Sequence, residues 1–111
     1  MSIEEKKLLM DVLNAIKGIK FHLGETRNFN IYKQNLTIRR AVERELEIIG
    51  EAINNLLKLN PDIQISNARF IVDLRNKVIH AYDSVNDTII WKVIVKDIPL
   101  LENEVEGLLK D

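Results

Sequence analysis

The residues best suited to chemistry stand close together in the second half of the chain, in the run Arg75-Asn76-Lys77-Val78-Ile79-His80-Ala81-Tyr82. A histidine of near-neutral pKa can take the proton from a ribose 2′-hydroxyl or give one to a leaving oxygen. An arginine can neutralise charge that develops on phosphoryl oxygens, through two directed donors. Asn76 precedes His80 by one helical turn and could orient its ring or bind phosphate. These residue types fit cleavage of RNA without a metal ion.

The run is expected to end a helix that begins at Ser66 or Asn67 and extends to Asp83. At about 100° per residue, with Arg75 at zero, Tyr82 falls at about -20° and His80 at about 140°. The core-facing side is expected to carry Phe70, Leu74, Val78 and Ala81. The other half of the helix then carries the candidate site, with two supporting residues, Asn76 and Asp83, beside Arg75, His80 and Tyr82.

Two apolar residues, Val72 and Ile79, interrupt this polar half at about 60° and 40°. A solvated catalytic face has no need of them, whereas a symmetric partner laid across the face would bury them. We therefore predict a homodimer with Val72 and Ile79 in its interface. Two subunits would supply two histidines and two arginines, enough for a base, an acid and a charge clamp.

For several of these residues a structural role is the alternative to a catalytic one. Helix ends favour basic residues because of the helix dipole, and this explains His22 and could explain Arg75 and His80. Tyr82 could be an interface aromatic. Three arginines could contact phosphates, but their interleaving with glutamates favours a solvated, ion-paired face (Arg39, Arg40, Arg44 with Glu43, Glu45, Glu47). No carboxylate cluster has metal-ligand spacing, so neither a metal nor another cofactor is expected.

Helical signals dominate the rest of the chain. Ser2 and Glu5 form a capping-box pattern at the start of a helix that Gly24 ends. After a loop over 24–30, in which Asn28 or Asn30 could cap the next helix, a long central helix is expected over 31–59. Its seam has the 4, 3, 4, 3 spacing of a helix packed lengthwise on others: Val42, Leu46, Ile49, Ile53 and Leu56. Gly50 either marks a close helix crossing or is tolerated by chance.

The region over 86–109 is strand-like by propensity, but no other strand is predicted for it to pair with, so we expect a helix there. We expect Trp91 to lie in the core, and Pro99 to kink this helix or to begin a new segment. The predicted fold is all-α, a four- to five-helix up-and-down bundle forming one domain over 1–111.

Composition limits the function. The 111 residues include 16 Lys+Arg, 17 Asp+Glu and no Cys. A balanced charge excludes a broad basic grip on nucleic acid, and the lack of cysteine excludes disulfides and thiolate metal sites. The N-terminus lacks the apolar region of a signal peptide, and no apolar run approaches the ~18 residues of a membrane span. We expect a cytoplasmic domain without a membrane partner.

The motif near the end of the third helix resembles that of a known family. Arg75-x4-His80-x-Tyr82 is similar to the R-x4-H-x-Y signature of HEPN-domain proteins of the HepT-like toxin group. The segment from Ala41 to Ala52 resembles that group's second helix, Leu74 to His80 its third, and Asp87 to Leu101 its closing segment. An apolar-Pro-Trp stretch that often precedes the third helix is replaced here by residues 65–70, which concerns packing more than the site.

The resemblance implies a HEPN-like homodimer whose arginine and histidine line a cleft at the subunit interface. It implies a metal-independent ribonuclease in which Arg75 and His80 are catalytic and Asn76 assists. The protein would be the toxin of a toxin–antitoxin pair, acting on RNA and with no DNA substrate expected. Its partner would be a minimal nucleotidyltransferase of the MntA kind, which attaches AMP to the motif tyrosine, here Tyr82. The alternative is a non-catalytic helical adaptor dimer that binds a nucleotidyltransferase or nucleotide.

Overall fold

The computed structural model describes residues 1–25, 27–80 and 87–110, with the backbone alone for residues 77–80. These residues form α1 (Ile3–Leu23), α2 (Phe29–Gln34), α3 (Leu36–Leu59), α4 (Ala68–His80), α5 (Asp87–Lys92), a π-helical segment η1 (Val93–Asp97) and α6 (Ile98–Lys110). No strand occurs in these three ranges, and the prediction of an all-α bundle is confirmed.

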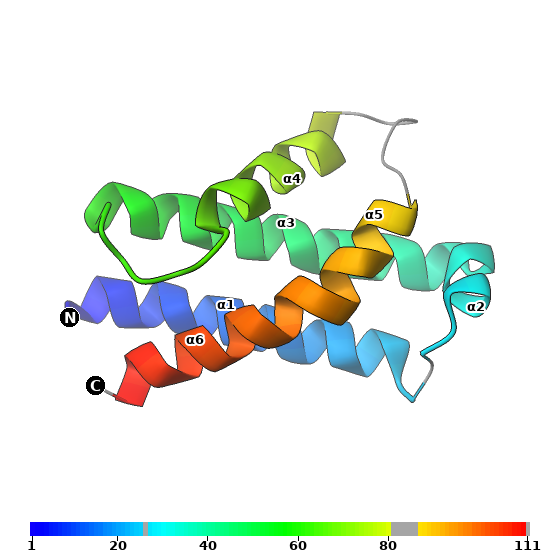
Figure 1. Cartoon of the computed structure of the whole chain (residues 1–111), viewed down its shortest axis with the longest axis horizontal. Helices are drawn as coiled ribbons and strands as arrows, with labels where there is room; N and C mark the ends of the chain where they lie inside the picture. Colours follow the sequence, from blue (N-terminus) through cyan, green and yellow to red (C-terminus); the bar gives the residue numbers. More distant parts are fainter. Residues whose placement is uncertain (26, 81–86, 111) are drawn as a thin grey trace.

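The long helix α3 is the centre of the bundle. Helix α1 packs along it, α4 packs against it on another side, and α6 lies beside α1 (Figure 1). The segments α5, η1 and α6 follow one another as a bent rod that crosses the bundle (Figure 1). The central position predicted for this helix is therefore confirmed.

Helix α1 begins and ends as its sequence predicts. The Ser2 hydroxyl accepts a hydrogen bond from the Glu5 backbone N–H at 3.0 Å, and the Glu5 carboxylate accepts one from the Ser2 N–H. Gly24 ends the helix with a φ of 60°, a left-handed value that favours glycine, and its N–H donates to the Lys20 carbonyl oxygen.

The predicted helix over 31–59 is wrong at its first turn, because a separate helix, α2, precedes α3. Asn35 makes the break: its backbone is extended, with φ -103° and ψ 96°. Its side chain accepts a hydrogen bond from the Ile38 N–H at 3.0 Å and so caps α3. Asn28 caps α2 in the same way. Asparagine competes well for such N-terminal positions, which overrides the continuous helical pattern.

The C-terminal region is helical, as predicted, and bends just before Pro99. The Ile98 N–H donates to the Val93 carbonyl oxygen, five residues back, which is the bond of a π-helix. Proline has no N–H and its ring crowds the carbonyl four residues before it, so the wider turn accommodates Pro99 without ending the rod.

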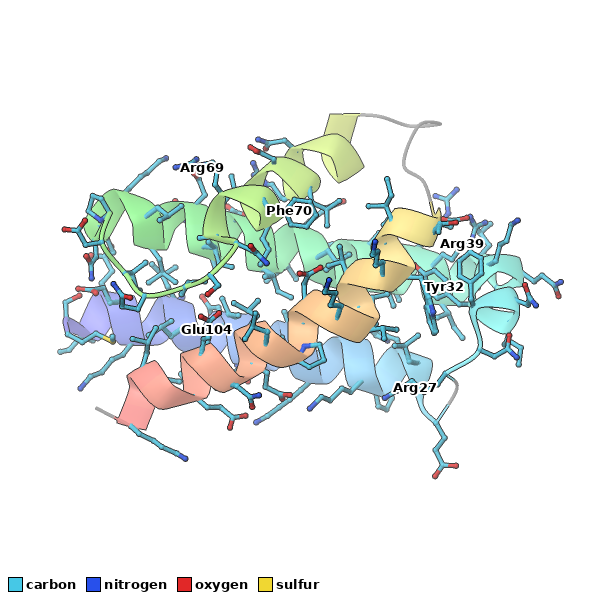
Figure 2. The ribbon with its side chains drawn as sticks, in the orientation of Figure 1. Arg27, Tyr32, Arg39, Arg69, Phe70 and Glu104 are labelled. Carbon is cyan, nitrogen blue, oxygen red and sulfur yellow. The ribbon has the colours of Figure 1, made fainter. Side chains whose placement is uncertain are left out.

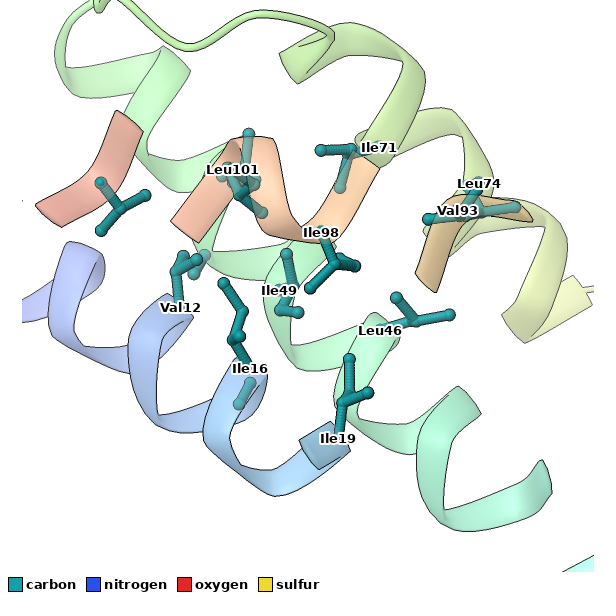
Figure 3. Packing of buried hydrophobic residues seen from close by; sticks show 14 of the residues in the cluster. Val12, Ile16, Ile19, Leu46, Ile49, Ile71, Leu74, Val93, Ile98 and Leu101 are labelled. Carbon is teal, nitrogen blue, oxygen red and sulfur yellow. The ribbon is translucent and has the colours of Figure 1, made fainter. Parts of the chain in front are cut away.

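The core lies between α1, α3, α4 and the C-terminal rod (Figure 3). The predicted α3 seam is confirmed, since its five residues are at most 2% exposed. Trp91 is only partly buried and packs on the Tyr32 ring, whose centroid lies 5.2 Å away. Within the described ranges, no helix combines the length and apolar character that crossing a bilayer requires.

Candidate functional site

The candidate site is built on α4, and the structure corrects the predicted orientation of this helix. Val72 is 4% exposed and belongs to the core, whereas Phe70 is 45% exposed. Among the side chains of α4 that the structure describes, the buried ones are those of Ala68, Ile71, Val72 and Leu74. Val72 is thus explained by the chain's own core and gives no support to a subunit interface. The prediction gave Phe70 to the core on hydrophobicity alone, without knowing which side faces α3.

Arg75 lies toward the core side of α4 rather than on its open half. It follows the buried residues Ala68 and Ile71 at positions i+7 and i+4, and therefore shares their stripe. Its side chain is partly buried and its Nε is fully buried. This Nε has no hydrogen-bond partner in the part of the chain that is described. In this position the aliphatic stem of the Arg75 side chain is fixed, and the terminal nitrogens of its guanidinium are left to make contacts.

Gly50 of α3 is what allows Arg75 to take this place. A Cβ placed on Gly50 would overlap the Arg75 Cβ, lie 2.6 Å from its Cγ and lie 3.4 Å from the Ile71 carbonyl oxygen. The two helices therefore cross with no room for a side chain at position 50. Of the two interpretations that the sequence left open for Gly50, the close crossing is correct.

The Arg75 guanidinium is oriented by its neighbour in sequence. Its Nη1 donates to the Asn76 Oδ1 at 2.9 Å, and Asn76 itself is exposed. The amide oxygen of Asn76 is thereby committed to Arg75, so Asn76 supports the arginine. Asn76 therefore contacts Arg75, while its predicted roles of orienting the histidine ring or binding phosphate stay predictions.

The other predicted residues are placed only in part. His80 is the last residue of α4 and follows Arg75 by about 7.5 Å along the axis and about 140° around it. The side chains of Ile79 and His80 lie outside what the structure describes, as do Tyr82 and Asp83 entirely. The assignments of these four residues stay predictions.

A partly buried ionic cluster anchors α5, the helix that comes after residues 81–86. The Arg39 Nη1 lies 3.0 Å from the Asp87 Oδ2, and both side chains are about three-quarters buried, at 26% and 21% exposed. Burial, and then the Asp87 charge, raise the pKa of Glu43, which Arg39 lowers in part. Burial also raises the pKa of the Tyr32 hydroxyl. Figure 2 shows Tyr32 and Arg39 together at this end of the bundle.

Sequence reasoning missed this cluster because it placed the arginines of α3 on a solvated face. Arg44 does form an exposed pair with Glu47 at 3.1 Å, as that reasoning predicts. Arg39 differs because α5 returns over it, and the pairing with Asp87 spans 48 residues in sequence. Helical periodicity within α3 contains no signal for such a contact.

His22 also has a partner that its sequence position did not reveal. Its Nε2 lies 3.0 Å from the Glu45 Oε2, between α1 and α3. Gly18 leaves the space for this carboxylate, since a Cβ there would overlap the Glu45 Oε2. The pair joins two packed helices. Among the described residues, no three His, Cys, Asp or Glu side chains are grouped as metal ligands.

Comparison with known protein families shows which family this chain belongs to. The sequence profile of the family described as “Ribonuclease HepT-like” matches residues 12–108. The chain belongs to the HepT-like ribonuclease family. The match includes α3 and α4, and therefore the Gly50–Arg75 crossing and the whole motif from Arg75 to Tyr82.

Individual relatives agree with the HepT-like assignment. A protein of Thermococcus cleftensis named “Probable ribonuclease HepT” is 35% identical over 114 residues, covering 99% of this chain and all of the relative. A protein with an RNase name from Caldanaerobacter subterraneus subsp. tengcongensis is 35% identical, covering 89% of this chain and 82% of its own. A protein of Methanocaldococcus jannaschii, also with an RNase name, is 32% identical, and the match covers 96% of this chain and 88% of that relative. No solved structure matches this chain.

Proposed function

We propose that this HepT-like chain cleaves RNA with Arg75 and His80, without a metal ion, in a cleft between two identical subunits. The observation that supports this most is the positioning of Arg75. Its stem is fixed at the Gly50 crossing and its guanidinium is oriented by Asn76, on the same helix that ends at His80. A preorganised cation beside a general acid–base group suits phosphoryl transfer, because it costs no reorganisation during the reaction.

The reaction that fits these groups starts from the substrate's own ribose. One histidine takes the proton of the 2′-hydroxyl, and the 2′-oxygen attacks the adjacent phosphorus. The bond from phosphorus to the 5′-oxygen breaks, and that oxygen receives a proton from the second histidine of the dimer. Arg75 stabilises the charge on the non-bridging oxygens. The products are a 2′,3′-cyclic phosphate and a 5′-hydroxyl end.

This proposal is tested by a substrate that cannot supply the nucleophile. An RNA with one 2′-deoxy nucleotide at the mapped cleavage site should resist cleavage there, and the intact RNA should give a cyclic-phosphate end by mass spectrometry. Cleavage at the deoxy position would contradict the mechanism. An intact dimer that leaves all RNA uncut would instead favour the adaptor alternative.

The proposed biological role is that of a toxin neutralised by a nucleotidyltransferase. Attachment of AMP to Tyr82 would put bulk and negative charge two residues after His80 and near Arg75, in competition with the RNA phosphate. The purified chain, its cognate transferase, ATP and Mg²⁺ should yield an adenylylated product by intact mass. Tyr82→Phe should remain unlabelled, with Tyr32→Phe as the matched control; equal labelling of Tyr82→Phe would refute the assignment.

A further inference from the structure

A groove between α4 and the C-terminal rod is separate from the Gly50–Arg75 crossing and has no assigned role. It has a volume of about 450 Å³, within the size range of small-ligand sites. Its lining comes from the start of α4 and from the α5–η1 segment: Asn67, Phe70, Ile89, Lys92, Val93, Lys96 and Asp97. Figure 2 shows Phe70 on the side of α4 that faces α5.

The groove combines an open apolar floor with cations. Phe70 and Ile89 are 45% and 49% exposed, although both are large apolar residues. Lys92 and Lys96, four residues apart on the rod, are both exposed on the lining. In the part of the chain that the structure describes, no ion pair or hydrogen bond involves either lysine, whereas Lys7 and Lys20 are paired with carboxylates.

The acid in the groove, Asp97, forms no ion pair with these lysines within the described ranges. The Asp97 Oδ1 accepts a hydrogen bond from the Asn67 Nδ2 at 3.3 Å, which ties the rod to the start of α4. A flat aromatic face beside two exposed lysines is complementary to a ligand that has a flat apolar part and anionic groups. Single-stranded nucleic acid has this chemistry, because its bases stack on aromatic rings and its phosphates pair with lysines.

We propose that this groove is a nucleotide subsite for single-stranded RNA, in which a base stacks on Phe70 and the flanking phosphates pair with Lys92 and Lys96. The inference rests on the proposed RNA cleavage, which supplies the substrate class. Phe70 precedes His80 by ten residues on α4, or about 15 Å along the axis, which equals about four stacked nucleotides at ~3.4 Å each. The subsite therefore binds RNA several nucleotides from the scissile phosphate.

Binding is measured with a 2′-O-methyl RNA oligonucleotide, which resists attack by its own 2′-oxygen, and fluorescence anisotropy on the full chain. Phe70→Ala should weaken binding about tenfold, the effect of removing one stacked base. The double variant Lys92→Gln/Lys96→Gln should reduce the slope of log Kd against log salt by about 1.4, at ~0.7 for each phosphate of a single strand that a lysine no longer neutralises. Matched controls on α1, Phe21→Ala and Lys6→Gln/Lys17→Gln, should bind as the unchanged protein does.

Cleavage kinetics and sedimentation complete the test. With a long RNA, the groove variants should raise KM more than they lower kcat, and this effect should shrink as the RNA is shortened. Groove variants that bind and cleave long RNA as the unchanged protein does would overturn the subsite and leave the proposed function standing. A Phe70→Ala protein that loses its dimer would also overturn it, by identifying the groove as a subunit contact. An unchanged protein that neither binds nor cleaves RNA would overturn both proposals.

Discussion

Gly50 and Arg75 meet across the crossing of α3 and α4 so closely that a Cβ at position 50 would overlap the Arg75 Cβ. The residue on α3 that lacks a side chain thus fixes the position of the residue on α4 that we propose to stabilise the transition state. The packing of α3 against α4 therefore determines where Arg75 lies, because α4 cannot move away from α3 without moving Arg75.

Replacing Gly50 with alanine should therefore impair cleavage. The added methyl forces α4 outward, and a displacement of about 1 Å at a catalytic group can lower the rate by up to ~100-fold. Overpacking costs about 1–3 kcal/mol, which the better helix propensity of alanine offsets by ~1 kcal/mol, so the protein should still fold. The measurement is kcat together with a urea unfolding curve.

Gly107→Ala is the matched control for this variant, because nothing lies within 4 Å of the added Cβ on α6. It should gain up to ~1 kcal/mol of stability and keep full activity. A Gly50→Ala protein with the kcat of the unchanged protein would show that the crossing does not position the catalytic arginine.

Asn76→Ala should lower kcat several-fold and leave the stability nearly unchanged. Asn76 is exposed, so little packing is removed, but the acceptor that orients the Arg75 guanidinium is missing. The exposed residue Asp73 on the same helix provides the control, Asp73→Ala, which should cleave normally. Equal rates for both variants would argue that Asn76 has no role in orienting Arg75.

The Arg39–Asp87 pair should contribute to stability through the docking of α5. Arg39→Met should destabilise the protein by about 1–3 kcal/mol, between the values for exposed and buried pairs, because it leaves Asp87 beside Glu43 without its ion-pair partner. Arg44→Met, which breaks an exposed pair, should cost less than about 0.5 kcal/mol. Similar losses from both substitutions, measured by urea unfolding, would contradict the anchoring role.

Glu43 should make stability depend on pH in an unusual direction for a carboxylate. Its pKa is raised in the folded protein, so the folded state resists ionisation of Glu43, and stability is lost progressively as the pH rises from the ordinary glutamate value through the folded-state pKa. Glu43→Gln should therefore raise the melting temperature at neutral pH. This gain should shrink as the pH falls through the raised pKa and disappear below the ordinary glutamate value of about 4.3. The exposed control Glu51→Gln should show no such gain, and a gain for Glu43→Gln that persists at low pH would contradict this origin.

Local signals in the sequence predicted the helices well. The capping box at Ser2, the stop at Gly24 and the α3 seam all depend on residues a few positions apart, and each is confirmed. Asn35 was missed because a capping asparagine inside a continuous apolar pattern looks like an ordinary helical residue. The end of a helix there depends on a side-chain hydrogen bond that periodicity does not reveal.

The site was harder to predict because the face of α4 that packs inward depends on its neighbours. Phe70 has the larger apolar side chain, yet the smaller Val72 is buried and Phe70 remains open. The sequence did contain one sign of how the helices pack, Gly50, since a glycine inside a helix often permits a close helix crossing. What the sequence lacked was the identity of the residue opposite, Arg75, because that contact spans two helices.

RNA cleavage in EDTA by single alanine variants of Arg75 and His80 decides whether these two residues carry out the reaction without a metal ion. The unchanged protein should cleave, whereas Arg75→Ala and His80→Ala should lose cleavage while sedimenting as the unchanged protein does. Arg69→Ala, an exposed arginine on the same helix, and His22→Ala, at the only other histidine, are the matched controls and should remain active. Cleavage that survives both Arg75→Ala and His80→Ala, or that EDTA abolishes in the unchanged protein, would show that this pair does not catalyse metal-independent cleavage.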